Sequence, residues 1–165
     1  MKPTSGTLEI TTPSDREILI TRPFDAPRHL VFEAYTTPAL VKRWLGVWRH
    51  WSLAVCEIDL RVGGSYRYVW QGHEGESMGM SGVYREIVAP ERIVCTEVFD
   101  QAWYEGECLN RIELIEHEGR TILHETLLYA SKQVRDGVLA SPMETGLIAS
   151  YDNLAALLAE SISRR

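Results

Sequence analysis

The chain has 165 residues, 45% of them hydrophobic, and a net charge of −6 from 17 basic and 23 acidic side chains. These values are typical of one globular domain with a substantial core. The acidic balance, without a basic cluster longer than the terminal Arg pair, excludes nucleic acid and anionic membranes as principal partners.

The composition also indicates where the protein works. Its longest apolar runs are far shorter than the roughly 18 residues that span a bilayer, and the first ten residues lack a secretory apolar region. We therefore expect no membrane insertion. The three cysteines, Cys56, Cys95 and Cys108, include no CxxC pair. Such a sparse, odd set is typical of a reducing compartment, so we expect a cytoplasmic protein.

The first third of the chain predicts a tail, one strand and two helices. Residues 1–15 are expected to be an N-terminal tail, either disordered or an added edge strand, and 16–162 a single domain. Residues 16–24, rich in Ile and Leu, predict the first strand. The helical spacing of 25–36 starts after Asp25 as a cap, with Pro27 in the first turn. Residues 37–45 predict a second short helix, which Gly46 ends.

The middle of the chain alternates between apolar segments and turn residues, which predicts an antiparallel meander. We expect strands at residues 52–59, 64–71, 78–88, 92–99, 109–117 and 121–130. The clearest turns are "APER" at 89–92 and "HEGR" at 117–120, where Gly119 allows a tight hairpin. Residues 100–108 give no assignable pattern.

The last segment predicts a long amphipathic helix. Ser141 is expected as its N-cap, with Pro142 at the first helical position and Glu144 completing a capping box. The apolar face that follows consists of Leu147, Ile148, Tyr151, Leu154, Ala155 and Leu158. Gly146 costs about 1 kcal/mol inside a helix, which indicates close approach of another group. A single helix needs a sheet to pack on, and a long antiparallel sheet curls around it.

Four segments carry a resemblance to a known family. They are "TRPFDAPRHLVFEAYTTPALVKRW" (21–44), "EIDLRVGGSYRY" (57–68), "GVYREIVAPERIV" (82–94) and "ETGLIASYDNLAALLAE" (144–160). Together they resemble the bacterial single-domain homologues of the activator of heat-shock protein 90 ATPase, within the START-like (SRPBCC) superfamily. The resemblance covers nearly everything from residue 16 to residue 160.

The resemblance implies an α+β helix-grip fold, in which a curved antiparallel sheet wraps a long C-terminal helix. It also implies a cavity between sheet and helix that accepts a hydrophobic ligand in many relatives, and a link to the stress response. It implies no shared chemistry. The eukaryotic activator has a separate chaperone-binding domain for which this chain has no room, so chaperone contact is not expected to carry over.

Alternating aromatic residues in "SYRYVWQ" (65–71) predict rings on one face of a strand. Two interpretations stay open, namely that these rings line a ligand cavity and that they fill a core. For a small hydrophobic or aromatic ligand, the candidate contacts are Tyr68, Trp70, Met80 and Tyr84 from the sheet and Leu147, Tyr151 and Leu154 from the helix. The segment from Trp48 to Trp51 is a candidate lid, whereas Trp44 is better explained as an anchor of the second helix.

The sequence favours a binding protein over an enzyme. It contains no HExxH, HxH or Cys/His cluster, no G-x-S-x-G elbow and no phosphate-binding glycine motif, so we expect neither a metal nor a cofactor. For a cyclase- or hydrolase-type enzyme the remaining acid–base candidates are His124 and Glu97, although strand alternation favours the solvent face for both. A third interpretation is an interaction module that binds a chaperone or forms a homodimer.

Overall fold

The structure, a computed structural model, describes residues 7–164. Within that range two strands come first, β1 (Glu9–Thr11) and β2 (Glu17–Phe24), followed by the helices α1 (Arg28–Thr36) and α2 (Pro38–Val41). The strands β3 (Ser52–Ile58), β4 (Ser65–Gln71), β5 (Ser77–Val88), β6 (Arg92–Phe99), β7 (Cys108–His117) and β8 (Arg120–Leu128) follow. The chain closes with α3 (Lys132–Leu139) and α4 (Met143–Ser163).

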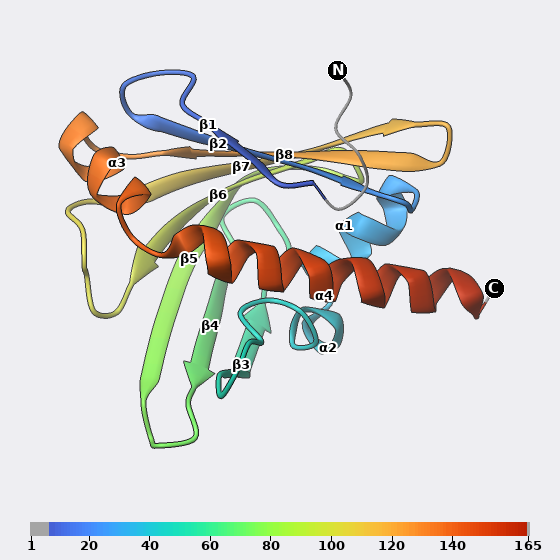
Figure 1. Cartoon of the computed structure of the whole chain (residues 1–165), viewed down its shortest axis with the longest axis horizontal. Helices are drawn as coiled ribbons and strands as arrows, with labels where there is room; N and C mark the ends of the chain where they lie inside the picture. The colour runs from blue at the N-terminus through green and yellow to red at the C-terminus, as the bar shows by residue number, and fades with distance from the viewer. Residues whose placement is uncertain (1–6, 165) are drawn as a thin grey trace.

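The strands form one curved antiparallel sheet in the order β1-β2-β8-β7-β6-β5-β4-β3 (Figure 1). Strands β3 to β8 are the expected meander, and β2 joins its far end by pairing Glu17 with Leu128. The hairpin between β7 and β8 turns at Glu118 and Gly119, both with positive φ, which is the geometry of a tight two-residue turn. The predicted turn at 117–120 is therefore confirmed.

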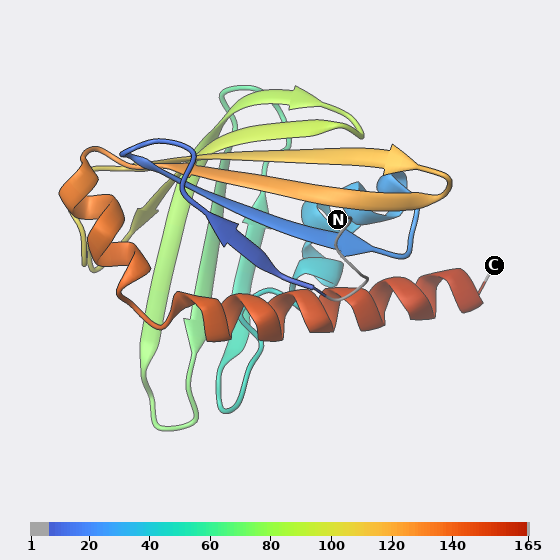
Figure 2. The same cartoon turned by 45° about the horizontal axis from the view of Figure 1, so that its top comes forward.

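Helix α4 lies across the concave side of the sheet, as the two views in Figure 1 and Figure 2 show. The ring of Tyr151 meets that of Phe24 on β2 edge to face, with centroids 6.0 Å apart. The buried Arg22 on β2 donates a hydrogen bond of 3.0 Å to Asp152 on the helix. An aromatic pair and an ion pair thus hold the helix against the sheet. The predicted α+β helix-grip architecture is confirmed.

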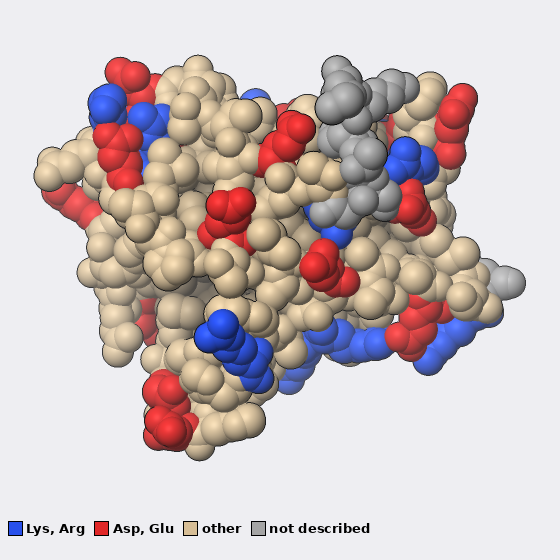
Figure 3. All heavy atoms as spheres, in the orientation of Figure 1, with Lys and Arg blue, Asp and Glu red and all other residues tan. Residues whose placement is uncertain are grey.

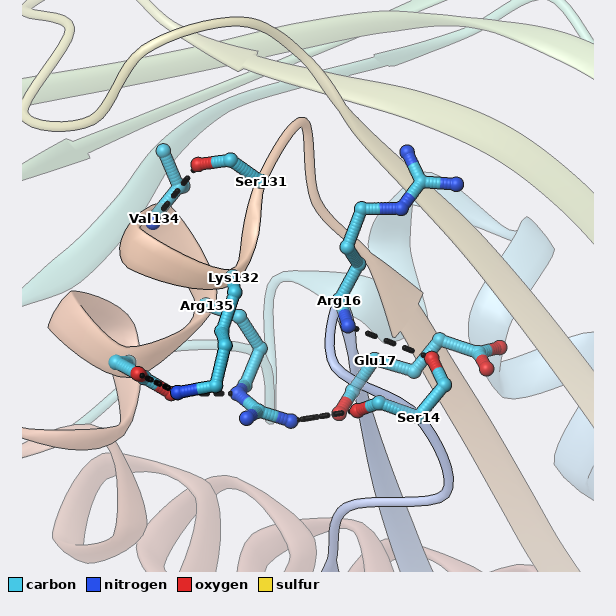
Figure 4. A network of polar contacts seen from close by, with 8 residues as sticks. Ser14, Arg16, Glu17, Ser131, Lys132, Val134 and Arg135 are labelled. Atoms are coloured by element: carbon cyan, nitrogen blue, oxygen red, sulfur yellow. Dashed lines mark hydrogen bonds and ion pairs between the residues drawn. The ribbon is translucent and has the colours of Figure 1, made fainter.

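Helix α3, which the sequence analysis did not assign, connects the sheet to α4. Ser131 caps it by accepting a hydrogen bond from the backbone N–H of Val134. The buried Arg135 donates to the carbonyl oxygen of Ser14, 2.6 Å away in the β1–β2 connection, and its Nε donates to Asp136 (Figure 4). The guanidinium therefore fixes α3 against the start of the chain.

The starts of two helices and the end of a third differ from those expected. The N-cap of α1 is Pro27, and Asp25 accepts a hydrogen bond from Arg120 instead. Helix α2 ends at Val41, earlier than predicted, although Gly46 does turn the chain with φ +69°. The capping box is wrong: Ser141 donates to the carbonyl of Val138 at the end of α3, so α4 begins only after Pro142.

The expected N-terminal tail is partly a strand. Residues 9–11 form the edge strand β1, which pairs with β2, whereas residues 1–6 lie outside the described residues. Within 7–164, no helix is both long and apolar enough to cross a membrane. On the face drawn in Figure 3, acidic side chains are scattered, whereas several basic side chains gather along the lower right edge beside acidic ones.

Candidate functional site

The aromatic residues of β4 point to the inside of the curved sheet. Tyr66, Tyr68 and Trp70 are all buried, while Arg67 between them pairs with Asp100 on the outer face at 2.6 Å. Period-two alternation produces this separation. The inward orientation predicted from the sequence is confirmed.

These rings border an inner chamber of about 250 Å³ between the sheet and α4. Its walls are mostly apolar and include side chains from every strand between β4 and β8. The lining residues used below are Tyr68, Trp70, Met80 and Tyr84 from the sheet, Leu147 and Tyr151 from α4, and three polar residues at the sheet side, Glu97, Asn110 and Glu125.

An outer groove of about 620 Å³ continues from the chamber. The two spaces share Trp70, Glu97, Phe99 and Leu147, among others. The groove is further bordered by Trp48 and Trp51, by the loop between β6 and β7, by the end of α3 and by the start of α4. A ligand longer than the chamber therefore has room to extend outward.

Aromatic residues with a polar atom are concentrated around these two spaces. All five tryptophans and all seven tyrosines of the chain line the chamber or the groove. In the loop between β6 and β7, Trp103 and Tyr104 meet edge to face at 5.0 Å, and Tyr104 does the same with Tyr129 at 5.5 Å. Such rings combine large apolar surfaces with hydrogen-bonding tips.

The segment before the candidate lid is held firmly to its surroundings. The indole N–H of Trp70 donates to the carbonyl of Leu45 at 2.9 Å, and Asn153 on α4 donates to the carbonyl of Val47 at 2.7 Å. A Cβ on Gly46 would lie 2.2 Å from the Trp70 ring, so only glycine fits there. Beyond this anchor, Trp48 and Trp51 pair their backbones and border the groove.

Two carboxyl side chains and one amide form a polar group inside the chamber. The side-chain N–H₂ of Asn110 on β7 donates to Glu97 on β6 at 2.6 Å and to Glu125 on β8 at 2.8 Å. The hydroxyl of Tyr151 donates to the second oxygen of Glu125. Residues from three adjacent strands and α4 thus meet at one point.

Burial and mutual repulsion change the ionisation of both carboxyls. Burial, followed by the charge of Glu125, raises the pKa of Glu97 from 4.5 to about 7. Burial also raises the pKa of Glu125, against the opposing hydrogen bonds from Tyr151 and Asn110. Two carboxyls close together in a poorly solvated site do not readily ionise together.

The chain matches the family model described as activator of Hsp90 ATPase homolog 1-like protein, over residues 25–159. It belongs to this family. The match spans most of the chain and includes every residue named so far in the chamber, whose lining residue Ile20 alone precedes the matched range. The resemblance seen in the sequence is therefore confirmed.

Solved structures support the same assignment. A Rhodobacter sphaeroides protein is 33% identical, with a TM-score of 0.87, and the match covers 93% of this chain and 98% of that one. A Chromobacterium violaceum protein is 28% identical, with a TM-score of 0.75, and covers 88% and 98%. An AHSA1-like protein of Aeromonas hydrophila shares the fold at 18% identity and a TM-score of 0.66, covering 87% and 93%. No curated protein matched significantly.

In this AHSA1-like domain most of the predicted contact residues lie around the two spaces. Tyr68, Trp70, Met80, Tyr84, Leu147 and Tyr151 line the chamber, and Trp48 and Trp51 line the groove. Leu154 is fully buried in the core and borders neither space. Trp44, interpreted as an anchor, is buried and donates to the carbonyl of Ala34, but it also lines the chamber.

The acid–base candidates need correction. The interpretation that Glu97 faces solvent is wrong, because its side chain lines the chamber. Glu125 and His124 are adjacent on β8 and therefore face opposite sides of the sheet, and the structure puts Glu125, not His124, into the chamber. Period-two alternation shows that the two residues face apart, but not which of them faces inward. Among residues 7–164, no group of three or more His, Cys, Asp or Glu could hold a metal ion.

Proposed function

We propose that this domain binds a small apolar or aromatic molecule in the chamber, with room for an extension into the groove. One observation carries the proposal: every tryptophan and tyrosine of the chain borders these two spaces. Polar-tipped rings around a concave apolar site are typical of ligand pockets. A core that served stability alone would not need a space of about 620 Å³ beside it.

Apolar burial supplies the driving force, and the polar atoms orient the ligand. Each 100 Å² of apolar ligand surface removed from water contributes about 2.5 kcal/mol, before the cost of immobilising the ligand. The chamber offers few polar groups, mainly Glu97, Asn110 and Glu125. A ligand with one polar end and an apolar body fits this distribution.

Two glycines in helices provide a matched pair of variants to test the proposal. Gly146 on α4 borders the groove, and Gly137 lies on α3 outside both spaces. A Cβ at either position would meet no atom within 4 Å, so the close approach expected at Gly146 is wrong. A side chain can therefore be attached at either position without a clash at Cβ, but only Gly146→Leu adds it at the border of the groove.

The test is native mass spectrometry of freshly purified protein, followed by extraction and identification of any bound compound. We expect a reproducible bound mass in the wild type and in Gly137→Leu, and its reduction or loss in Gly146→Leu. Thermal shifts with a panel of indoles, naphthalenes and fatty amides should follow the same order. An empty wild-type protein that no member of the panel stabilises would contradict the proposal.

A second candidate function, acid–base catalysis, is favoured by the position of Glu97. Its carboxyl group lines the chamber and has a pKa of about 7, which suits proton transfer at neutral pH. Conversion of a bound compound by the wild type, with loss of turnover but not of binding in Glu97→Gln, would support a cyclase or hydrolase. Unchanged turnover in the variant would exclude Glu97 as the acid or base.

A further inference from the structure

The two carboxyls of the chamber have no basic partner. No Lys, Arg or His lines the chamber or the groove among the described residues. Between residues 7 and 164, neither Glu97 nor Glu125 takes part in an ion pair of 4 Å or less. A buried charge without a countercharge costs free energy of folding. The pair is therefore stable either when it is protonated or when a cation binds to it.

The side-chain amide of Asn110, which lies between the carboxyls, also has an unfilled hydrogen-bonding position. Asn110 is 4% exposed and lines the chamber, and its N–H₂ group donates to both Glu97 and Glu125. Its Oδ1 atom is buried and has no hydrogen-bond partner within the described part of the chain. Buried polar atoms are nearly always paired. The free acceptor beside two carboxyls therefore indicates a ligand that donates several hydrogen bonds at this point.

The walls around this acceptor group are aromatic. Tyr66, Trp70 and Phe99 line the same chamber as the carboxyls. The faces of such rings attract cations that lie within about 6 Å of the ring centre. Aromatic walls and two carboxyls favour the same kind of chemical group, an organic cation. A bare metal ion is disfavoured, because among residues 7–164 no third His, Cys, Asp or Glu joins the two carboxyls to form a metal-binding group.

We propose, building on the ligand-binding role above, that the ligand carries a protonated amine, which lies against Glu97, Glu125 and Asn110. Its apolar body extends among the rings toward the groove. The ammonium supplies up to three N–H donors and a positive charge, which pair with the carboxylates and the free amide oxygen. An anionic ligand would be repelled, and a neutral one would leave the carboxyls uncompensated.

The affinity for such an amine depends on pH through the carboxyls alone. The other titratable groups that face them have pKa values raised by burial, so they stay neutral between about pH 6 and about pH 8. These groups are Tyr35 on α1, Tyr66 and Tyr68 on β4, Cys95 on β6, Tyr104 in the loop between β6 and β7, Cys108 on β7, Tyr129 directly after β8, and Tyr151 on α4. An ammonium remains protonated in this range, whereas the carboxyl pair loses its proton as the pH rises. Binding of the amine therefore strengthens with rising pH. At the lower pH, binding displaces a proton from the carboxyl pair.

The experiment compares three probes of nearly equal shape by titration calorimetry on the full chain. Tryptamine carries the ammonium, 3-propylindole is neutral and indole-3-propionate is anionic. We expect tryptamine to bind about tenfold or more tightly than 3-propylindole at about pH 8, a difference typical of hydrogen bonds to a charged group. The preference should shrink at about pH 6, where buffers of different ionisation enthalpy should reveal proton release.

Two Glu→Gln variants separate the effect of the carboxylate charge on binding from the effect of side-chain shape. Glu97→Gln keeps the size of the side chain and should lose most of the preference for tryptamine while still binding 3-propylindole. Glu57→Gln changes an exposed carboxylate on β3, outside both spaces, and should behave like the wild type. Equal affinity for tryptamine and 3-propylindole, or an unchanged preference in Glu97→Gln, would overturn the amine assignment and leave ligand binding standing. Failure of all three probes to bind would count against both proposals.

Discussion

At the scale of single residues, the chamber brings together groups that a core optimised for stability would avoid. Glu97 and Glu125 approach one amide, Asn110, in a site walled by rings. Replacing such a polar group by apolar residues of similar size is often neutral or stabilising. Retaining it costs stability, which is typical of a site shaped by what it binds.

The first prediction concerns the pH dependence of stability. The pKa of Glu97 rises from 4.5 to about 7 on folding, so the native state holds this proton more tightly than the unfolded chain. The free energy of unfolding should therefore fall as the pH rises through this window and level off above it. Glutamine at position 97 cannot ionise and should remove this decrease.

Chemical denaturation of the wild type and Glu97→Gln, over the range from about pH 5 to about pH 8, measures this effect. The two proteins should be equally stable at the acid end, and the variant about 1–3 kcal/mol more stable at the basic end. Glu57→Gln serves as the control with the same charge change on the surface. Parallel pH profiles of the wild type and Glu97→Gln would contradict the burial of an ionisable Glu97.

The residues of the site differ in how readily the sequence predicts them. Alternation in "SYRYVWQ" was enough to place Tyr68 and Trp70 inside, because Arg67 and Gln71 fix the outer face. Alternation does not predict which residue of β8 faces the chamber. His124 and Glu125 are neighbours and both polar, so their polarity does not distinguish the inner face from the outer one. The inward carboxyl is decided by pairing with Asn110 and Tyr151, residues distant in sequence.

At the scale of elements, β5 and β6 approach each other closely where the sheet bends. The pairing of these strands shifts register between Tyr84 and Glu86, which is the mark of a β-bulge. Just before this point, a Cβ on Gly82 would lie 1.8 Å from the carbonyl oxygen of Thr96. The backbone of β6 occupies that space, so glycine is required at position 82.

The second prediction compares two glycines on β5. Gly82→Ala should lower the free energy of unfolding by about 2–4 kcal/mol, because backbone must move to admit the methyl group. At Gly79 the nearest atoms belong to Asp100 and Arg67, flexible side chains on the outer face. Gly79→Ala should cost less than about 1 kcal/mol. Thermal or urea unfolding measures both, and similar losses would argue against the close approach of the strands.

Elements with strong local signals were predictable, whereas those fixed by distant partners were not. The hairpin at 117–120 and the strands around it follow from turn residues and alternation. Helix α3 is short, and its buried Arg135 donates to Ser14 and Glu17, backbone partners far away in the sequence, as well as to Asp136 beside it. Ser141 fits a capping box in sequence, but its hydroxyl and its backbone N–H both donate to the carbonyl of Val138 at the end of α3.

At the scale of the whole molecule, the curved sheet and α4 enclose a space instead of closing on each other. The last helix touches the sheet through Tyr151 and Asp152, and the chamber lies beside this contact. The lid segment, the loop with Trp103 and Tyr104, and α3 then extend the space into the groove. The family resemblance predicted this arrangement, but not the acidic pair inside it.

The distribution of tryptophans makes the central claim directly observable. Trp44 lines the chamber alone, Trp70 lines both spaces, and Trp48, Trp51 and Trp103 line the groove alone. Their indole N–H groups therefore report on the two spaces separately in an NMR spectrum of the free and bound protein.

The decisive measurement is a titration of isotope-labelled protein with tryptamine and with 3-propylindole, followed by NMR of backbone and indole N–H signals. We expect saturable shifts at Trp70, Tyr84 and Tyr151, with little change at Ile10 on the edge strand β1. Shifts confined to the outer face of the sheet, or no saturable shift with either probe, would contradict ligand binding between the sheet and α4.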